Sequence, residues 1–318
     1  MSKIFITRSL PSIAVELLNK NNFEVVIFSK NRTITKRELI KEAKDADAII
    51  SLLTDTIDKE VIDNLNNCKV IANYAVGYNN IDTAYAHQKN IVVTNTPDIL
   101  TDATADLTFT LILACARRLF EGDTLVRSNN FKGWSPNLLL GIDLNHKTLG
   151  IIGAGRIGSA VIKRASAFGM KSIYYSRSKN NDIENDYSAK KVGLDYLLKH
   201  SDVISVHLPL TSETKNIINK EKLSMLKSTA ILINTARGEL IDENHLIHLL
   251  KKKKIFAAGL DVYTNEPDIN KNFFKLNNVV LAPHVGSATM ETRSKMAELA
   301  VKNVINVLTG KKPITPVI

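Results

Sequence analysis

The stretch KTLGIIGAGRIGSAVIKRA, residues 147–165, decides the fold of this chain. Its first part, TLGII, has the composition of a buried β-strand, and its last part continues as an amphipathic helix. Between them, GAGRIG fits G-x-G-x-x-G in the strand–turn–helix context that a dinucleotide-binding turn requires. Gly153 allows the tight turn, Gly155 lets a pyrophosphate approach the backbone, and Gly158 permits close helix–strand packing. We therefore predict a Rossmann-type unit with a dinucleotide at this turn.

The residues after the next expected strand, SIYY, bear on which dinucleotide is bound. NAD-binding sites commonly have a carboxylate at this position, which accepts hydrogen bonds from the ribose hydroxyls. Such a carboxylate would repel the 2′-phosphate of NADP. This chain has Ser176, Arg177 and Ser178 instead, followed by the positive charge of Lys179. An arginine can pair with a phosphate through two hydrogen bonds. We predict that NADP(H) is preferred and NAD(H) possible. The alternative is that Arg177 packs over the adenine ring, which both cofactors would tolerate.

Short apolar runs alternate with helical patterns along the whole chain. This alternation predicts parallel strands joined by crossover helices, hence an α/β fold with two doubly wound sheets that divide near residues 97–102. A long helical stretch is expected at 101–129 and a final helix at 290–308. The expected strands of the first block are 3–7, 23–28, 47–53, 69–74 and 91–95, and those of the second are 147–153, 172–175, 202–208, 229–234, 257–262 and 278–283.

Composition narrows the class of protein. The 318 residues are 44% hydrophobic and 23% charged, which is typical of a globular protein. The net charge of +10 is dispersed, so no nucleic-acid partner is expected. The longest apolar run, 107–116, is too short to span a membrane, and no signal peptide is visible. Two isolated cysteines indicate a reducing, cytoplasmic compartment. The seven histidines show no metal-ligand spacing.

Three residues at the ends of late strands could support chemistry. Arg237 follows ILIN, Glu266 lies in the loop after AAGLDV, and His284 follows NVVLAP. Each alone is typical of a surface or structural residue. Ligands of open α/β sheets bind at the carboxyl ends of the strands, however. There, an arginine, a carboxylate and a histidine can bind a substrate carboxylate and exchange a proton, as oxidation of a 2-hydroxyacid needs.

The motifs GAGRIG, HLPLTSETKNIIN, NTARGELID, LDVYTNEP and APHVGSAT occur in this order, after NYAVGYNNIDT and NTPDILTDATADLT. Over essentially the whole chain, this succession resembles the D-isomer-specific 2-hydroxyacid dehydrogenases, and most of all the glyoxylate and hydroxypyruvate reductases. The resemblance implies a Rossmann-type NAD(P)-binding domain at 99–285, inserted into a flavodoxin-like substrate domain formed by 1–98 and 286–318. It also implies a homodimer.

The same resemblance implies roles for individual residues. Arg237 would bind the substrate carboxylate, His284 would act as the acid, and Glu266 would keep the imidazole protonated. The backbone amides of Val76 and Gly77 would also donate to the substrate carboxylate. Leu53 would line the pocket beside C3 of the substrate. Trp134 would touch the partner's substrate or simply pack at the interface. The residues expected at the cofactor are Thr104, Gly153, Ala154, Gly155, Arg156, Ile157, Gly158, Ser176, Arg177, Ser178, Leu208, Pro209, Thr235, Ala236, Asp261, Gly286 and Ser287.

The expected activity is therefore reduction of a small 2-oxoacid, glyoxylate or hydroxypyruvate, to the D-2-hydroxyacid with NADPH or NADH. A D-3-phosphoglycerate or D-lactate-type dehydrogenase is the alternative within enzymes. A cofactor-sensing, corepressor-like binding protein is a remote alternative. The residues do not decide which 2-oxoacid is used or in which direction the reaction runs.

Overall fold

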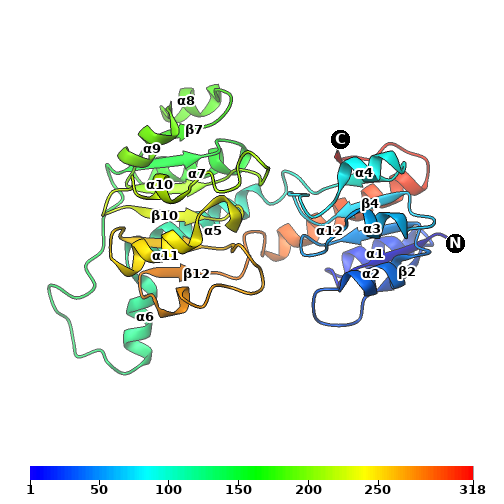
Figure 1. Cartoon of the computed structure of the whole chain (residues 1–318), viewed down its shortest axis with the longest axis horizontal. Helices are drawn as coiled ribbons and strands as arrows, with labels where there is room; N and C mark the ends of the chain where they lie inside the picture. Colours follow the sequence, from blue (N-terminus) through cyan, green and yellow to red (C-terminus); the bar gives the residue numbers. More distant parts are fainter. Residues whose placement is uncertain (318) are drawn as a thin grey trace. The chain divides into compact units, whose positions relative to one another are not determined.

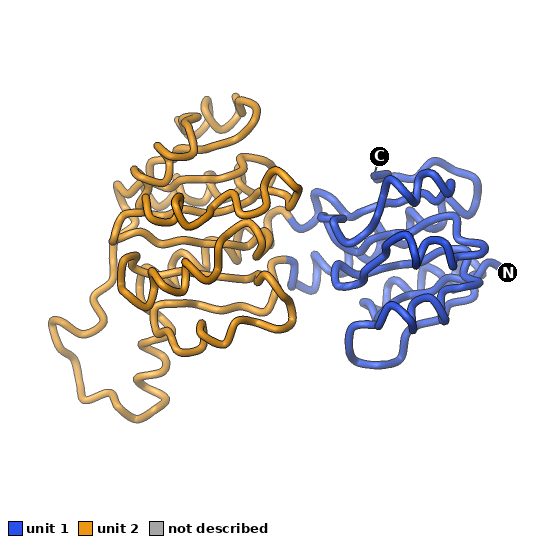
Figure 2. Tube along the Cα trace, viewed as in Figure 1, with its two compact units in different colours: residues 1–100, 287–318 blue, residues 101–286 orange. Residues whose placement is uncertain are grey.

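A computed structural model describes residues 1–317 of the chain. The chain forms two compact units (Figure 2), one made of Met1–Leu100 and Ser287–Ile318, the other of Thr101–Gly286. The second unit is thus an insertion in the first. Across the described residues, no helix is both long and apolar enough to cross a membrane.

The sheet of the first unit has the strand order β13-β5-β4-β3-β1-β2. Its five longer strands are parallel, and β13 pairs antiparallel with β5 at the edge. The order of the parallel strands is that of flavodoxin-like folds. The strands are β1 (Lys3–Ile6), β2 (Glu24–Ile27), β3 (Ala48–Ser51), β4 (Val70–Asn73), β5 (Val92–Thr94) and β13 (Pro316–Val317).

Helices cover both faces of this sheet, because successive residues of each strand point to opposite faces and both sets are apolar. On one face, β-strand residues pack with buried residues of α1 and α12. On the other, they pack with those of α2, α3 and α4. The helices are α1 (Ile13–Lys20), α2 (Lys36–Ala43), α3 (Lys59–Asp63), α4 (Thr83–Gln88) and α12 (Met290–Leu308).

The sheet of the second unit has the order β12-β11-β10-β9-β6-β7-β8, and all its pairs are parallel. Counted from β6, this is the Rossmann order with one further strand. The switch point therefore lies between β6 and β9. The strands are β6 (Thr148–Ile152), β7 (Lys171–Tyr175), β8 (Lys190–Lys191), β9 (Val203–Val206), β10 (Ile231–Asn234), β11 (Ala257–Leu260) and β12 (Val279–Leu281).

The second sheet is also covered on both faces (Figure 1). Buried residues of α5, α7 and α8 pack on one face, and those of α9, α10 and α11 on the other. The helices are α5 (Thr101–Ala116), α6 (Leu119–Arg127), α7 (Arg156–Ala167), α8 (Asn181–Tyr187), α9 (Leu194–His200), α10 (Lys220–Leu223) and α11 (Glu243–Lys251), with single 3₁₀ turns at Gly238–Leu240 and Phe273–Lys275.

The helical stretch expected at 101–129 is two helices rather than one. Arg118 adopts a left-handed conformation with φ 51°, which interrupts the helix after α5. The amide of Ile142 donates to the carbonyl of Ala116 at 2.9 Å, so a later segment of chain satisfies the end of α5. No residue of α6 is buried. A residue far away in sequence thus satisfies the carbonyl at the end of α5.

The two-sheet α/β fold and all eleven expected strands are confirmed. Two strands were not predicted, β8 and β13, each of only two residues. β8 is a pair of lysines and β13 begins with a proline, so neither has the apolar alternation that marks a strand. Both lie at sheet edges, where such residues are tolerated.

Candidate active site

The glycine-rich turn between β6 and α7 has the geometry that its sequence indicates. Gly153 has φ +101°, and a Cβ there would lie 2.6 Å from the carbonyl oxygen of His207. A Cβ on Gly158 would collide with the carbonyl of Gly153. Gly155, in contrast, has open space where a Cβ would be. Two of the glycines are therefore required by the packing of the chain, whereas Gly155 leaves a free approach to the backbone, which fits a bound pyrophosphate.

No side chain caps the N-terminus of α7 at Gly155, so the positive end of the helix dipole is available to an anion. The turn itself is held by Asn180, which sequence reasoning missed. Its Nδ2 donates to the carbonyl of Ala154 at 3.0 Å and to Ser159 Oγ at 3.1 Å. The same side chain caps α8 by accepting from the amide of Ile183. In the sequence, the only indication of this role for Asn180 is its position shortly after β7.

The segment after β7 is ordered by its own contacts. Ser176 Oγ donates to the carbonyl of Ser178 at 3.0 Å, and Lys191 Nζ donates to the carbonyl of Arg177 at 2.9 Å. Lys179, expected to add positive charge, forms an ion pair with Glu184 at 2.9 Å, so its charge is compensated. The side chain of Arg177 is exposed and has no ion pair within the described part of the chain. Arg177 and Lys191, neither of which forms an ion pair among residues 1–317, therefore both contribute positive potential at this edge.

Several other residues expected at the cofactor lie together in the second unit. Thr104 Oγ1 donates to the carbonyl of Gly286 at 3.2 Å, and the Gly286 amide donates to Asp261. Thr108 links Thr104 to Thr235 through hydrogen bonds of 2.8 and 2.9 Å. Ala154 belongs to the glycine turn, and Arg156 and Ile157 begin α7. Leu208 and Pro209 follow β9, Ala236 follows β10, and Ser287 begins the last segment of the first unit.

Arg237 lies just after β10. The side chain of Asn234 donates to its carbonyl at 2.8 Å, and the guanidinium donates to the carbonyl of Ala236 at 2.6 Å. Gly238 then packs against the backbone of Tyr263 so closely that no Cβ would fit. Burial lowers the pKa of Arg237, while the carboxylates of Glu266 and Glu239 oppose that shift. An arginine stays charged nonetheless, so the site contains a shielded guanidinium.

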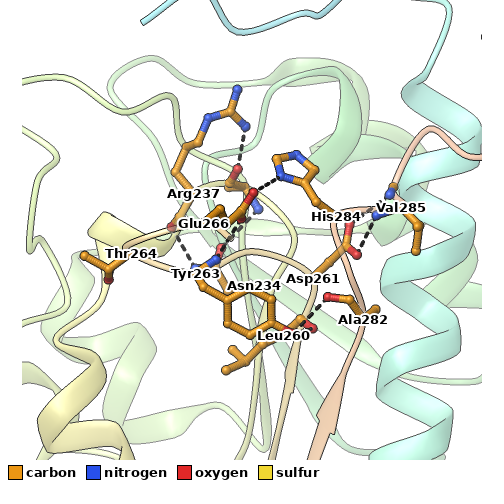
Figure 3. Close-up of polar contacts among 12 residues, drawn as sticks. Asn234, Arg237, Leu260, Asp261, Tyr263, Thr264, Glu266, Ala282, His284 and Val285 are labelled. Carbon is orange, nitrogen blue, oxygen red and sulfur yellow. Dashed lines mark hydrogen bonds and ion pairs between the residues drawn. The ribbon is translucent and has the colours of Figure 1, made fainter. Parts of the chain in front are cut away.

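Glu266 and His284 form an ion pair. Glu266 Oε2 lies 2.7 Å from His284 Nδ1, and each side chain is 24% exposed. The amide of Tyr263 donates to the other carboxylate oxygen at 2.9 Å. Burial alone would raise the pKa of Glu266, but the hydrogen bond and charge of His284 and the charge of Arg237 lower it. Glu266 is therefore an anion that orients the ring of His284 and leaves its Nε2 available (Figure 3).

The backbone at His284 is left-handed, with φ 55°, a conformation uncommon for residues other than glycine and asparagine. Asp261 stabilises this backbone conformation. Its two carboxylate oxygens accept hydrogen bonds from the amides of Val285 and Gly286, each at 2.8 Å (Figure 3). Burial raises the pKa of Asp261, and these two amides lower it. Such conformations cluster at functional sites, where surrounding contacts maintain them. Asp261 thus fixes the segment that presents His284.

A second histidine, His207, follows β9, but it is unsuited to donate a proton. Burial lowers its pKa to about 3, so the ring is neutral. Its Nε2 lies 2.8 Å from Ser205 Oγ. Of these two histidines at strand ends, only His284 is paired with a carboxylate.

The remaining expected substrate residues lie elsewhere. Leu53 is in the turn after β3, and Val76 and Gly77 follow β4, all within the first unit. Trp134 lies in the second unit on the long connection after α6, which projects from the body of that unit (Figure 1). Its side chain is 85% exposed, so this chain alone gives it no packing partner of substance.

Comparison with known proteins places this geometry in a family. Residues 109–286 match the family model for the D-isomer specific 2-hydroxyacid dehydrogenase, NAD binding domain. The chain is 49% identical over 315 residues to a glyoxylate reductase of Thermococcus litoralis, an alignment that covers 98% of this chain and 95% of that protein.

Two solved structures extend the comparison. The TT0316 protein of Thermus thermophilus superposes with a TM-score of 0.94 at 44% identity, over 99% of this chain and 100% of that one. An NADPH-dependent glyoxylate/hydroxypyruvate reductase of Sinorhizobium meliloti, in complex with NADP and malonate, superposes with a TM-score of 0.89 at 30% identity, over 99% and 96% of the two chains. Family model, full-length identity and fold agree, and the chain therefore belongs to the D-isomer-specific 2-hydroxyacid dehydrogenases, enzymes that depend on NAD(P).

Proposed function

We propose that this enzyme reduces glyoxylate, and with it hydroxypyruvate, to the corresponding D-2-hydroxyacid. The observation that carries the proposal is the convergence of Arg237 and the Glu266–His284 pair at the ends of β10, β11 and β12, in a unit whose glycine turn fits a dinucleotide. The glyoxylate reductases among its relatives support the choice of substrate.

In the proposed reaction, Arg237 binds the substrate carboxylate and polarises the neighbouring carbonyl. A guanidinium suits this role because its planar donors match a carboxylate in a bidentate way. Its partial burial strengthens the interaction, since electrostatic attraction is weaker in water. In the first unit, the amides of Val76 and Gly77 add hydrogen bonds to the same carboxylate, and Leu53 lines the side of the substrate's C3.

His284 is the proposed acid. Its Nδ1 is bonded to Glu266, so Nε2 is the atom that donates a proton to the developing alkoxide oxygen. Glu266 stabilises the positive charge of the ring before the proton leaves, and its lowered pKa keeps it ionised above its ordinary pKa of 4.5. Asp261 holds the loop of His284 and is proposed to orient the cofactor carboxamide. The nicotinamide, when bound, supplies the hydride.

The glycine turn and the N-terminus of α7 would hold the cofactor, since their backbone amides can donate to its diphosphate. Thr104, Leu208, Pro209, Thr235, Ala236, Gly286 and Ser287 are also proposed to contact the cofactor. We further propose that NADPH is preferred, because the exposed, positively charged Arg177 lies at the end of β7 and no carboxylate occupies positions 176–178.

Replacing Arg177 with alanine is expected to reduce kcat/KM for NADPH about 10- to 150-fold, since a hydrogen bond to a charged group contributes ~1.5–3 kcal/mol. The efficiency with NADH should change little. Initial rates with each reduced cofactor check this. Arg37→Ala, an exposed arginine of α2, is the control that should alter neither. An equal loss with both cofactors would instead show Arg177 packing on the adenine.

A panel of glyoxylate, hydroxypyruvate, pyruvate and 3-phosphohydroxypyruvate, assayed with each reduced cofactor, tests the proposed activity. Glyoxylate should have the highest kcat/KM. Highest efficiency with 3-phosphohydroxypyruvate or pyruvate would favour the phosphoglycerate or D-lactate type of dehydrogenase. Cofactor binding without turnover of any 2-oxoacid would favour a corepressor-like sensor.

We also propose that the enzyme is a homodimer formed through α6 and the connection after it. This segment exposes Leu119, Phe120, Val126 and Trp134 by 60%, 54%, 62% and 85%, and an isolated short helix is rarely stable without a packed face. Light scattering on the purified protein should give twice the chain's 35.2 kDa. Phe120→Asp combined with Trp134→Asp should give monomers, and a wild-type monomer would refute the proposal.

The compartment is proposed to be the reducing cytoplasm. Cys68 and Cys115 are both free and buried, and burial raises the pKa of each thiol to about 12. Neither thiol is a thiolate at neutral pH, so neither is a ready partner for a disulfide.

A further inference from the structure

In the loop after β4, three successive carbonyl groups, those of Ala75, Val76 and Gly77, accept hydrogen bonds from other residues of the first unit. The carbonyl of Ala75 accepts from the amide of Thr96 at 2.8 Å. The carbonyl of Val76 accepts from Asn95 Nδ2 at 2.8 Å, and that of Gly77 from Asn73 Nδ2 at 2.9 Å. Three successive peptide groups are thus anchored by their oxygens.

The orientation of the amides follows from this anchoring. In a trans peptide, the N–H points opposite to the C=O of the preceding residue. Among the described residues, the one cis peptide is Glu266–Pro267, so the peptides of this loop are trans. The amides of Val76, Gly77 and Tyr78 therefore point away from the residues that hold the carbonyls. None of these three amides donates a hydrogen bond within residues 1–317.

Asn73 is the centre of the polar network behind the loop. Its side chain is fully buried, accepts from Ser51 Oγ at 3.1 Å and donates to Asn80 Oδ1 at 3.2 Å. Asn80 in turn donates to the carbonyls of Leu52 and Asp55, both at 3.0 Å. The network therefore joins the turn after β3, which contains Leu53, to the loop after β4. One hydrogen-bond network thus connects both predicted substrate segments of the first unit.

We propose that Asn95 and Asn73 are positioning residues that aim three backbone amides, of Val76, Gly77 and Tyr78, at the substrate carboxylate. The inference rests on the proposed function and deepens it by adding Tyr78 as a third amide donor and by assigning the two asparagines. Successive amides of this kind form an anion-binding site without any charged side chain. An asparagine at 95 suits this support because its neutral amide donates to a carbonyl, whereas an aspartate there would repel it.

The test compares wild type with Asn95→Ala, Asn95→Gln and Asn73→Ala. Asn95→Ala should raise KM for glyoxylate about 5- to 100-fold, the loss expected when a hydrogen-bonded group loses its partner. The change in kcat should be much smaller, because carboxylate binding is shared by ground state and transition state. Asn95→Gln, which retains the donor, should recover part of the affinity. The affinity for NADPH and the melting temperature of the Asn95 variants should stay close to wild type.

Calorimetric titration with oxalate, an unreactive dicarboxylate, provides a readout that needs no turnover. Oxalate should bind wild type and bind Asn95→Ala more weakly by a similar factor. Asn278→Ala is the matched control, since Asn278 is also half-buried and donates to two backbone carbonyls, those of Leu250 and Phe256, in the second unit. Its kinetics and oxalate binding should not change.

The outcomes separate this inference from the proposed function. A wild type that reduces no 2-oxoacid, yet binds oxalate through Asn95, would refute the function and support the inference. A wild type that reduces glyoxylate, with Asn95→Ala unchanged in both KM and oxalate affinity, would overturn the inference alone. Failure of Asn73→Ala to fold leaves the Asn95 series decisive. Wild type without measurable oxalate binding would also overturn the inference.

Discussion

Replacing His284 with asparagine is expected to lower kcat for glyoxylate reduction by about 10²- to 10⁴-fold, the usual cost of losing a positioned acid. Asparagine is the informative substitute, because it tolerates the left-handed backbone that His284 adopts at φ 55°. The contact between Asp261 and the following amides should then persist. Single-turnover rates with saturating NADPH measure the effect, and His284→Ala should show the same loss.

The affinity for NADPH, measured by fluorescence titration, should remain near wild type in both variants. Glu266→Gln tests the role of the carboxylate. Glutamine has nearly the same shape and can still hydrogen-bond His284 Nδ1, 2.7 Å away in wild type, but it lacks the negative charge that stabilises the protonated ring. The variant's rate of reduction should begin to fall at a lower pH than in wild type. Near-normal turnover of His284→Asn would remove this residue from the mechanism, and an unshifted profile for Glu266→Gln would remove the electrostatic role of the carboxylate.

Replacing Arg237 with alanine is expected to lower kcat/KM for glyoxylate by about 30- to 5,000-fold, because removing one partner of a buried charged pair costs roughly 2–5 kcal/mol. Both KM and kcat should change, since the guanidinium binds the carboxylate and polarises the carbonyl. Arg237→Lys should recover little, because an ammonium cannot match the planar, bidentate geometry. Steady-state kinetics with the three proteins measure these effects.

A substrate without a carboxylate shows whether Arg237 binds the substrate carboxylate or only supports the fold of the site. Glycolaldehyde presents the same reacting carbonyl but offers no carboxylate for Arg237 to bind, so its kcat/KM should fall far less in Arg237→Ala. Loss of the same factor for glyoxylate and glycolaldehyde would mean that Arg237 supports the fold, through its contacts with Ala236 and the Glu266 segment, rather than the substrate.

Much of the fold could be predicted from the sequence because strand and helix periodicity are local. The run TLGII followed by GAGRIG predicted β6 and the turn into α7, and both are present. The final helix was expected at 290–308 and α12 spans those residues. The stretch 101–129 was predicted less well, because the left-handed Arg118 and the contact of Ile142 with Ala116 leave no periodic signal.

The site followed a similar division. Motif order indicated Arg237, Glu266 and His284 as a group, and their roles remain predictions for the kinetics above. The support of each residue was invisible in the sequence. Asn180 at the glycine turn lies in a polar stretch that is typical of a surface loop, and Asn73 lies at the end of an ordinary buried strand. The ion pair of Lys179 with Glu184, which the sequence did not show, compensates the additional positive charge expected beside Arg177.

By itself, the sequence determined the order of strands and helices, the glycine turn and the family of enzymes, since these depend on residues close together in the chain. Only the tertiary structure decided which distant groups meet. Glu266 contacts His284 across 18 positions, and Asp261 supports the same loop across 24 and 25. Such contacts depend on how strand ends are brought side by side, and hydrogen bonds between them are satisfied only once the sheet has formed.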